Sequence, residues 1–268
     1  MTSTLIAAET ARTPTDTDDR RPALSVRGLR VRYGTREVLS GVHLHVAPGE
    51  IVGLIGESGS GKTSHARTVL GLVPVAAGSI EIDGHDVGAF TSAQWRSFRR
   101  AGAAQYVFQD PLSSLDGRFT ARASVLEGVR RGHSAEQAEH RAAHALRTVG
   151  LAEPLWNRRP GQLSGGQRQR VAIARALAVD PTLLICDEPV SALDASSRIE
   201  VIRTLEEVAR SGTGVLIISH DLSSLSAIAD RVCVLHAAEV VESGPAADVL
   251  GSPQHPYTRR LIDAIPTL

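Results

Sequence analysis

The chain has 268 residues with 29 basic and 29 acidic side chains, and this zero net charge argues against bulk electrostatic binding to nucleic acid or membrane surfaces. Its length allows one large domain or two small ones, and the two cysteines, Cys186 and Cys233, lie in apolar runs that favour buried thiols in a reducing cytosol. No apolar run reaches the ~18 residues of a membrane span and no signal-peptide segment opens the chain, so we expect a cytoplasmic protein that does not cross a membrane.

The predicted elements begin after a polar N-terminal segment. Residues 1–22 are rich in Thr, Asp, Ala and Arg, which predicts a disordered tail before a domain over 23–268. Alternating apolar residues at 24–27 and 42–46 predict an antiparallel sheet. The next predicted elements are a buried parallel strand over 50–55, a helix over 64–72 and a strand over 79–83.

The pattern changes between about 92 and 161, where we expect an all-helical insert. Within it, the capping box Ser134-Ala135-Glu136-Gln137 predicts the start of a helix that ends near Gly150. After the insert, helices are predicted over 166–179, over 195–210 and after Asp221, with strands over 183–186, 215–218 and 231–235. This alternation predicts an α/β fold with a mostly parallel sheet, followed by a C-terminal extension over about 244–268.

One loop carries the strongest functional signal. Gly56-Glu57-Ser58-Gly59-Ser60-Gly61-Lys62-Thr63 has the form G-x-x-x-x-G-K-[ST] between an apolar strand and a helix. Its glycines allow backbone N–H groups to surround phosphate oxygens, and the helix N-terminus adds partial positive charge. Lys62 is expected to reach the outer phosphates, and the Thr63 hydroxyl to ligate Mg²⁺, with Ser64 beside it. The alternative is a chance glycine-rich turn.

Lys62 is the only lysine in the chain, and every other Lys or Arg position is arginine. A guanidinium is a broad planar fork, whereas a cup of backbone amides admits a compact ammonium group. The exception at Lys62 therefore supports a loop that binds nucleotide.

Two carboxylates end a predicted strand. The apolar run Leu183-Leu184-Ile185-Cys186 leads into Asp187-Glu188, at the strand end where ligands of open α/β sheets gather. Asp187 is suited to hold Mg²⁺, and Glu188 to orient and polarise an attacking water. The alternative for an isolated pair is a solvated strand end.

A second anion-binding end is predicted where Leu163-Ser164-Gly165-Gly166-Gln167 opens a helix. Its backbone amides and the Ser164 hydroxyl can face an anion, although no second lysine accompanies them. Taken alone, a Ser-Gly-Gly turn indicates a helix start and little more.

Together these motifs resemble the nucleotide-binding subunit of an ABC transporter, over roughly residues 24–266. The matching segments are the phosphate loop, the Q-loop Phe108-Gln109-Asp110, the signature 163–167, the Walker B strand 183–188, the D-loop Ser191-Ala192-Leu193-Asp194 and the H-loop Ser219-His220-Asp221. The resemblance implies a P-loop NTPase core with an N-terminal antiparallel β subdomain and an inserted helical subdomain. It also implies ATP and Mg²⁺ as cofactors.

The resemblance also implies roles for individual residues. Tyr33 would stack on the adenine, His220 would contact the γ-phosphate, and Gln109 would sense Mg²⁺ and link to the permease. The implied sets are catalytic Glu188, His220 and Gln109, metal ligands Thr63, Gln109 and Asp187, and signature and D-loop contacts from Ser164, Gly165, Gly166, Gln167 and Asp194. The residues alone leave a core aromatic at Tyr33 and a structural histidine at His220 as alternatives.

A finer resemblance involves Phe108 to Thr120 and the tail His255 to Leu261, which look like the dipeptide/oligopeptide/nickel importer group; Asp116-Gly117 departs from the Asn-Pro usual there. It implies an ATPase subunit on the inner membrane face, working with two permease subunits, a second ATPase of the same or a different chain, and an extracytoplasmic solute-binding protein. No nucleic-acid partner is expected. The alternatives are the cytosolic ATPase of a carbon–phosphorus lyase complex, disfavoured by the first segment, and an exporter ATPase, disfavoured by the tail.

Overall fold

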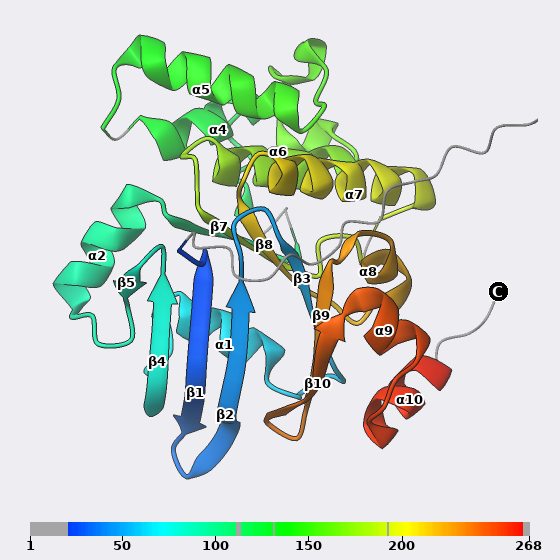
Figure 1. The fold of residues 1–268 in the computed structure, drawn as a ribbon. Coiled ribbons are helices and arrows are strands. Elements are labelled where there is room, and N and C mark those ends of the chain that lie inside the picture. The colour runs from blue at the N-terminus through cyan, green and yellow to red at the C-terminus, as the bar shows by residue number, and fades with distance from the viewer. Residues whose placement is uncertain (1–20, 111–113, 131, 192, 265–268) are drawn as a thin grey trace, which may run out of the picture.

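The computed structural model describes residues 21–110, 114–130, 132–191 and 193–264 (Figure 1). These ranges leave out residues 1–20 of the predicted tail, residues 111–113 and Ala192 of the D-loop.

A four-stranded antiparallel sheet opens the described chain, with strand order β2-β1-β4-β5. Its strands are β1 (Leu24–Tyr33), β2 (Arg36–Val46), β4 (Ala77–Ile82) and β5 (His85–Asp86). Because β1 pairs antiparallel with both β2 and β4, the sheet predicted from the alternating N-terminal segments is confirmed.

The second sheet has six strands in the order β10-β9-β3-β8-β7-β6. These are β3 (Ile51–Ile55), β6 (Ala104–Val107), β7 (Leu183–Asp187), β8 (Gly214–Ile218), β9 (Arg231–His236) and β10 (Glu239–Pro245). All neighbours pair in parallel except β10, which joins β9 antiparallel. β3 and β8 are buried throughout, as expected for strands covered on both faces, and the mostly parallel sheet is confirmed.

The helices of the described ranges mostly begin at a capping residue. They are α1 (Lys62–Val69), α2 (Ser92–Ala101), α4 (Ala121–Val129), α5 (Ala135–Thr148), α6 (Gly165–Leu177), α7 (Ala195–Arg210), α8 (Leu222–Ile228), α9 (Ala246–Gly251) and α10 (Pro256–Asp263). The capping box predicted at Ser134 is present with Gln137 as its partner, and Gly150 follows α5 in a left-handed conformation.

The prediction of an all-helical insert over 92–161 is wrong. Strand β6 lies inside this range and pairs with β7 from Ala104↔Leu183 to Val107↔Cys186, so the segment returns to the parallel sheet. The α2 helix before it packs through Phe98 against the antiparallel-sheet core, and only the part after β6 forms a separate helical layer. The β6 strand has only four residues, and Val107 is the only one of them that is fully buried. The sequence therefore showed no clear apolar pattern at this strand.

Two apolar cores cover the two faces of the six-stranded sheet. On one face, Val52 and Leu54 of β3 pack with α1 and the antiparallel sheet. On the other face, Ile51 and Ile55 pack with α4, α5, α6 and α7, which form the upper layer in Figure 1. Since α1 follows β3 and α6 precedes β7, both helices begin at the carboxyl edge of the sheet but on opposite faces.

Candidate nucleotide site

The phosphate loop packs closely against β9 and β2, and this close approach requires glycine at two of its positions. A Cβ at Gly56 would lie 2.1 Å from the carbonyl oxygen of Leu235, at the end of β9, and Gly56 has φ 150°. A Cβ at Gly61 would lie 2.7 Å from the carbonyl oxygen of Val38 on β2, and its φ of 115° is also unfavourable for other residues. These contacts hold both ends of the loop against the sheets.

Lys62 folds back over this loop. Its Nζ donates to the carbonyl oxygens of Gly56, at 2.6 Å, and Glu57, at 2.9 Å. Burial lowers the pKa of Lys62, and the nearby charges of Glu188 and Asp187 oppose that shift. The buried Ser60 hydroxyl has no hydrogen-bond partner among the described residues. An unsatisfied hydroxyl beside an ammonium and a helix N-terminus suits an anionic ligand.

Glu188 is held by the segment that follows β8. Its Oε1 accepts hydrogen bonds from the His220 backbone N–H at 3.1 Å and lies 2.6 Å from His220 Nδ1, while its Oε2 accepts from Ser219 Oγ at 3.2 Å. Glu188 also has a left-handed φ of 49°, which is uncommon for a residue with a side chain. The carboxylate is nearly buried, whereas the His220 side chain is 68% exposed.

Asp187 has a partner that the sequence did not indicate. Its Oδ2 accepts a hydrogen bond from the Tyr106 hydroxyl on β6, at 2.6 Å. Burial, together with this hydrogen bond, raises the pKa of Tyr106, so the phenol keeps its proton and remains a donor.

The strand order explains why these groups meet. Because β8 lies between β3 and β7, the H-loop at its carboxyl end lies between the phosphate loop and the two carboxylates. Gln109 and Glu188 also line a common small cavity of about 90 Å³, together with Gly165 and Leu193. The structure therefore brings Lys62, Asp187, Glu188, His220 and Gln109 to one edge of the sheet.

The signature opens α6 on the face of the sheet opposite to α1, with its Gly165 bordering the small cavity that Gln109 and Glu188 line. Ser164 and Gln167 form a reciprocal capping box at the start of α6, on the face of the sheet opposite to α1 (Figure 1). The Asp194 carboxylate caps α7 by accepting from Ser196 Oγ, Ser197 Oγ and the Ser197 N–H. These hydrogen bonds lower the pKa of Asp194. Both motifs thus also have a local structural role.

The adenine contact expected of Tyr33 depends on an exposed ring. Tyr33 is 46% exposed at the end of β1, so it is not a core aromatic.

Sequence reasoning missed the partners of three site groups: Tyr106 at Asp187, Ser219 at Glu188, and Tyr257 at the phosphate loop. Ser219 stood inside the H-loop motif and Tyr257 inside the tail segment His255 to Leu261, but neither motif indicated which group its side chain would contact. Tyr106 and Tyr257 come from β6 and from α10, and their partners depend on how these elements dock.

The donor set fits a nucleotide with Mg²⁺. In the described ranges, no group of three or more His, Cys, Asp or Glu residues is arranged to hold a metal by itself. Mg²⁺ is commonly bound by one or two carboxylates together with substrate phosphates, and Asp187 and the exposed Thr63 could supply protein ligands on that pattern.

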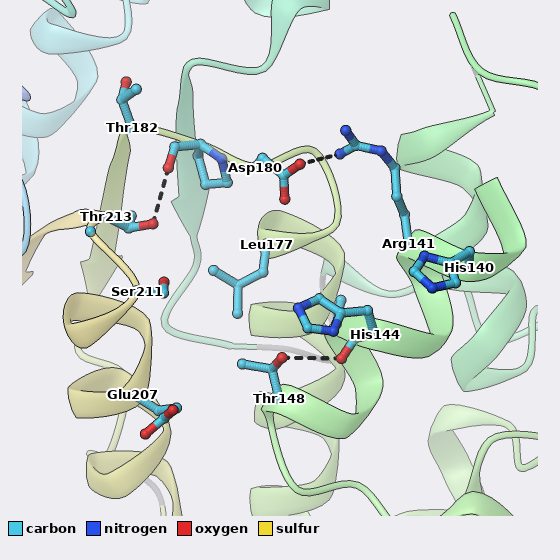
Figure 2. Close-up of a pocket in the computed structure, with 13 residues that line it drawn as sticks. His140, Arg141, His144, Thr148, Leu177, Asp180, Thr182, Glu207, Ser211 and Thr213 are labelled. Atoms are coloured by element: carbon cyan, nitrogen blue, oxygen red, sulfur yellow. Dashed lines mark hydrogen bonds and ion pairs between the residues drawn. The ribbon is translucent and has the colours of Figure 1, made fainter. Parts of the chain in front are cut away.

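A larger cavity lies away from this site, between α5, α6 and α7 (Figure 2). It has a volume of about 810 Å³ and is bordered by His144, Asp180 and Thr213. Thr182 and Thr213 in its wall precede β7 and β8, so the cavity is at the amino edge of the sheet. None of the predicted motifs contributes to it.

Comparison with known families and proteins gives two family matches. The ABC transporter family matches residues 39–191, and the family described as "Oligopeptide/dipeptide transporter, C-terminal region" matches residues 241–268. A "Putative peptide import ATP-binding protein" of Brucella ovis is 45% identical over 92% of this chain and 79% of its own length. The "Oligopeptide transport ATP-binding protein OppF" of Escherichia coli strain K12 is 38% identical over 93% of this chain and 79% of its own length.

Solved structures agree with this family. A bacterial ABC transporter cassette solved as a dimer matches with a TM-score of 0.72 and 29% identity, over 83% of this chain and 98% of that one. The cbiO1 protein of Clostridium perfringens, part of the ABC transporter complex cbiONQ, matches with a TM-score of 0.80 and 26% identity, over 86% and 91% of the two chains. No helix in the described ranges combines the length and apolarity needed to cross a bilayer. The chain belongs to the ABC transporter family as an ATPase whose hydrolysis of ATP is coupled to transport, and it carries an oligopeptide/dipeptide transporter C-terminal region.

Proposed function

We propose that this chain is the ATP-binding subunit of a peptide importer, bound at the inner face of the membrane. The observation that carries the proposal is the C-terminal match over residues 241–268, in a chain similar over more than nine-tenths of its length to proteins named for peptide import. It favours an importer over the carbon–phosphorus lyase and exporter alternatives. The partners proposed are two permease subunits, a second ATPase subunit and an extracytoplasmic solute-binding protein. Nickel remains a second solute to be tested.

In this proposal, the phosphate loop receives the triphosphate of ATP. Lys62 exchanges the carbonyl oxygens of Gly56 and Glu57 for phosphate oxygens, and the Ser60 hydroxyl gains the partner it lacks. Mg²⁺, when bound, would neutralise charge on the phosphates, with Thr63, Asp187 and Gln109 as the protein groups that hold or sense it. Tyr106 keeps the Asp187 carboxylate in one orientation.

Glu188 is proposed as the group that orients and polarises the attacking water. Donors from Ser219 and His220 fix its carboxylate in a nearly buried position, where it can accept a proton from water. The exposed ring of His220 can turn toward the γ-phosphate while its backbone N–H still holds Glu188. Catalytic positioning thus depends on the neighbouring ends of β7 and β8.

Transport of labelled solute tests the proposed function. The chain would be produced with the permease and solute-binding genes that neighbour its own, in cells lacking their peptide importers. We expect ATP-dependent uptake of a labelled oligopeptide, lost when Glu188→Gln replaces the wild type although the complex still assembles. Uptake of Ni²⁺ without peptide uptake would contradict the peptide assignment, and uptake of neither solute by an assembled complex would contradict both.

A further inference from the structure

The phosphate loop is in direct contact with the C-terminal region. The backbone N–H of Glu57 donates a hydrogen bond to the Tyr257 hydroxyl at 3.0 Å, across 200 residues of sequence. Tyr257 is 2% exposed. A buried phenol needs a partner for its hydroxyl, and here that partner is a backbone group of the loop that binds phosphate.

The Tyr257 ring is held by the strand end against which the loop packs. It stacks on His236, the last residue of β9, with ring centroids 3.7 Å apart and an interplanar angle of 23°. The neighbouring residue on that strand, Leu235, presents the carbonyl oxygen that excludes any side chain at Gly56. The ring and the first residue of the loop therefore share one support.

The start of α10 places Tyr257 in this position. His255 is the N-cap, with its Nδ1 accepting from the Tyr257 N–H at 3.2 Å, and Pro256 occupies the first turn. The Glu242 carboxylate of β10 accepts from the backbone N–H groups of Gln254, at 2.7 Å, and His255, at 3.0 Å. Each residue of His255-Pro256-Tyr257 thus has a defined part: the cap, the first helical turn and the contact with the loop.

Lys62 and Tyr257 hold the same peptide group from two sides. The peptide between Gly56 and Glu57 offers its carbonyl to Lys62 Nζ, at 2.6 Å, and its N–H to the Tyr257 hydroxyl. When Lys62 turns to the phosphates of a nucleotide, the bond from its Nζ to this carbonyl weakens or breaks. The hydrogen bond to Tyr257 then remains to keep the peptide in its orientation.

We propose that Tyr257 is a positioning residue for ATP, which acts through the Gly56–Glu57 peptide to keep the phosphate loop in its receptive conformation. The C-terminal region is then a structural part of the nucleotide site. This inference rests on nucleotide binding by the ATPase domain and is independent of the transported solute.

Tyr257→Phe tests the proposal because it keeps the stacked ring and removes only the hydroxyl. Loss of one hydrogen bond to a half-buried amide is expected to weaken ATP binding about 5–10-fold. The turnover number at saturating ATP should change less than about twofold, because a bound triphosphate orders the loop by itself. Amide hydrogen exchange in residues 56–61 should become faster without nucleotide.

The matched control is Arg259→Met on the same helix. Arg259 donates to the carbonyl oxygens of Pro253, at 3.0 Å, and Gln254, at 2.8 Å, so the change loosens α10 without touching the loop. It should leave ATP affinity and exchange in residues 56–61 unchanged. A second variant, His236→Ala, removes the ring on which Tyr257 stacks and should give a smaller effect in the same direction as Tyr257→Phe.

Binding of ATP to the purified full chain can be measured by calorimetry, with melting temperatures recorded for every variant. Unchanged affinity and exchange in Tyr257→Phe would overturn the proposal. Equal changes in Tyr257→Phe and Arg259→Met would also overturn it, because they would indicate general loosening of the C-terminal region. If Tyr257→Phe fails to fold, an unchanged ATP affinity in His236→Ala would count against the proposal, and a weakened one, with Arg259→Met unchanged, would support it.

Discussion

Lys62 differs from every other basic residue in the chain because its position admits only a narrow cation. Its ammonium donates to two carbonyl oxygens of a loop in which Gly56 and Gly61 leave no room for side chains. A planar guanidinium cannot occupy such a site in the same way.

We therefore predict that both Lys62→Ala and Lys62→Arg lose ATP hydrolysis by about 10²-fold or more, because the charge on the outer phosphates is left without its matched partner. Release of inorganic phosphate by the purified chain measures the effect. Arg67→Ala, at an exposed position of the same helix, is the control and should retain activity. Near wild-type hydrolysis by Lys62→Ala would contradict the assignment of this loop to the nucleotide site.

His65, three positions after Lys62 in α1, sets a pH dependence of stability. It is fully buried, neither ring nitrogen has a hydrogen-bond partner among the described residues, and burial lowers its pKa from 6.5 to about 4. Between about pH 6.5 and pH 4, His65 is therefore protonated in the unfolded chain but neutral in the folded chain. The free energy of unfolding thus falls as the pH falls through this range.

The corresponding prediction is a loss of roughly 3 kcal/mol of unfolding free energy from this one group across that window. Urea denaturation at pH 7.5 and at successive pH values down to 4.5 measures it. His65→Leu should remove this part of the pH dependence, while the part due to carboxylates remains. Parallel pH profiles for wild type and His65→Leu would show that the His65 ring is not kept neutral by burial.

At the scale of elements, the start of α6 is limited by its contact with α7. A Cβ on Gly166 would lie 2.6 Å from the Cβ of Ser197, closer than carbon atoms pack. The signature glycine is therefore required for packing in addition to any part in anion binding.

Gly166→Ala should destabilise the chain by about 1–3 kcal/mol, because α6 must move away from α7 to accept the methyl group. Gly161→Ala is the control, since nothing lies within 4 Å of its added Cβ. Midpoints of chemical denaturation compare the two variants. Equal stability of the two variants would contradict the prediction, because it would mean that α6 and α7 accommodate the methyl group without loss of stability.

Elements with local signals were predictable from the sequence, and elements defined by distant pairing were not. The α7 helix was predicted over 195–210 and found at Ala195–Arg210, since Asp194 caps it and apolar residues recur along one face. Strand β6 was missed because its four residues form a strand only through pairing with β7, which is distant in the sequence. The site followed the same rule: the phosphate loop and Asp187-Glu188 carry motifs, but Tyr106 and Tyr257 reach them through sheet order and tail docking.

At the scale of the whole molecule, the two predicted anion-binding helix ends belong to opposite faces of the sheet. The loop before α1 and the signature before α6 both open at the carboxyl edge, with the sheet between their helices. A similar cassette has been solved as a dimer. We therefore expect each ATP to lie between the phosphate loop of one subunit and the signature of another, so that ATP binding favours the closed pair.

Glu188→Gln tests this arrangement, because it keeps the shape of the side chain and one accepting oxygen but removes the basic carboxylate. Hydrolysis should slow by about 10²–10⁴-fold while ATP binding survives, since the loop and the proposed Mg²⁺ ligands are unchanged. The bridging γ-phosphate then persists, and size-exclusion chromatography with Mg-ATP should show a stable dimer with the second ATPase of the complex. Glu136→Gln, at an exposed position of α5, should still hydrolyse ATP and give no lasting dimer.

The dimer should also require the signature of the partner subunit. The Glu188→Gln substitution prolongs the contact between the phosphate loop and that signature, but it does not create the contact. Replacing Ser164 or Gly165 in the partner removes the helix end that faces the γ-phosphate, and the dimer should then be lost although each subunit still binds ATP. A Glu188→Gln chain that stays monomeric with saturating ATP bound and the correct partner present would contradict the shared site. Dimers that form equally well with and without the intact signature would place the contact elsewhere on the molecule.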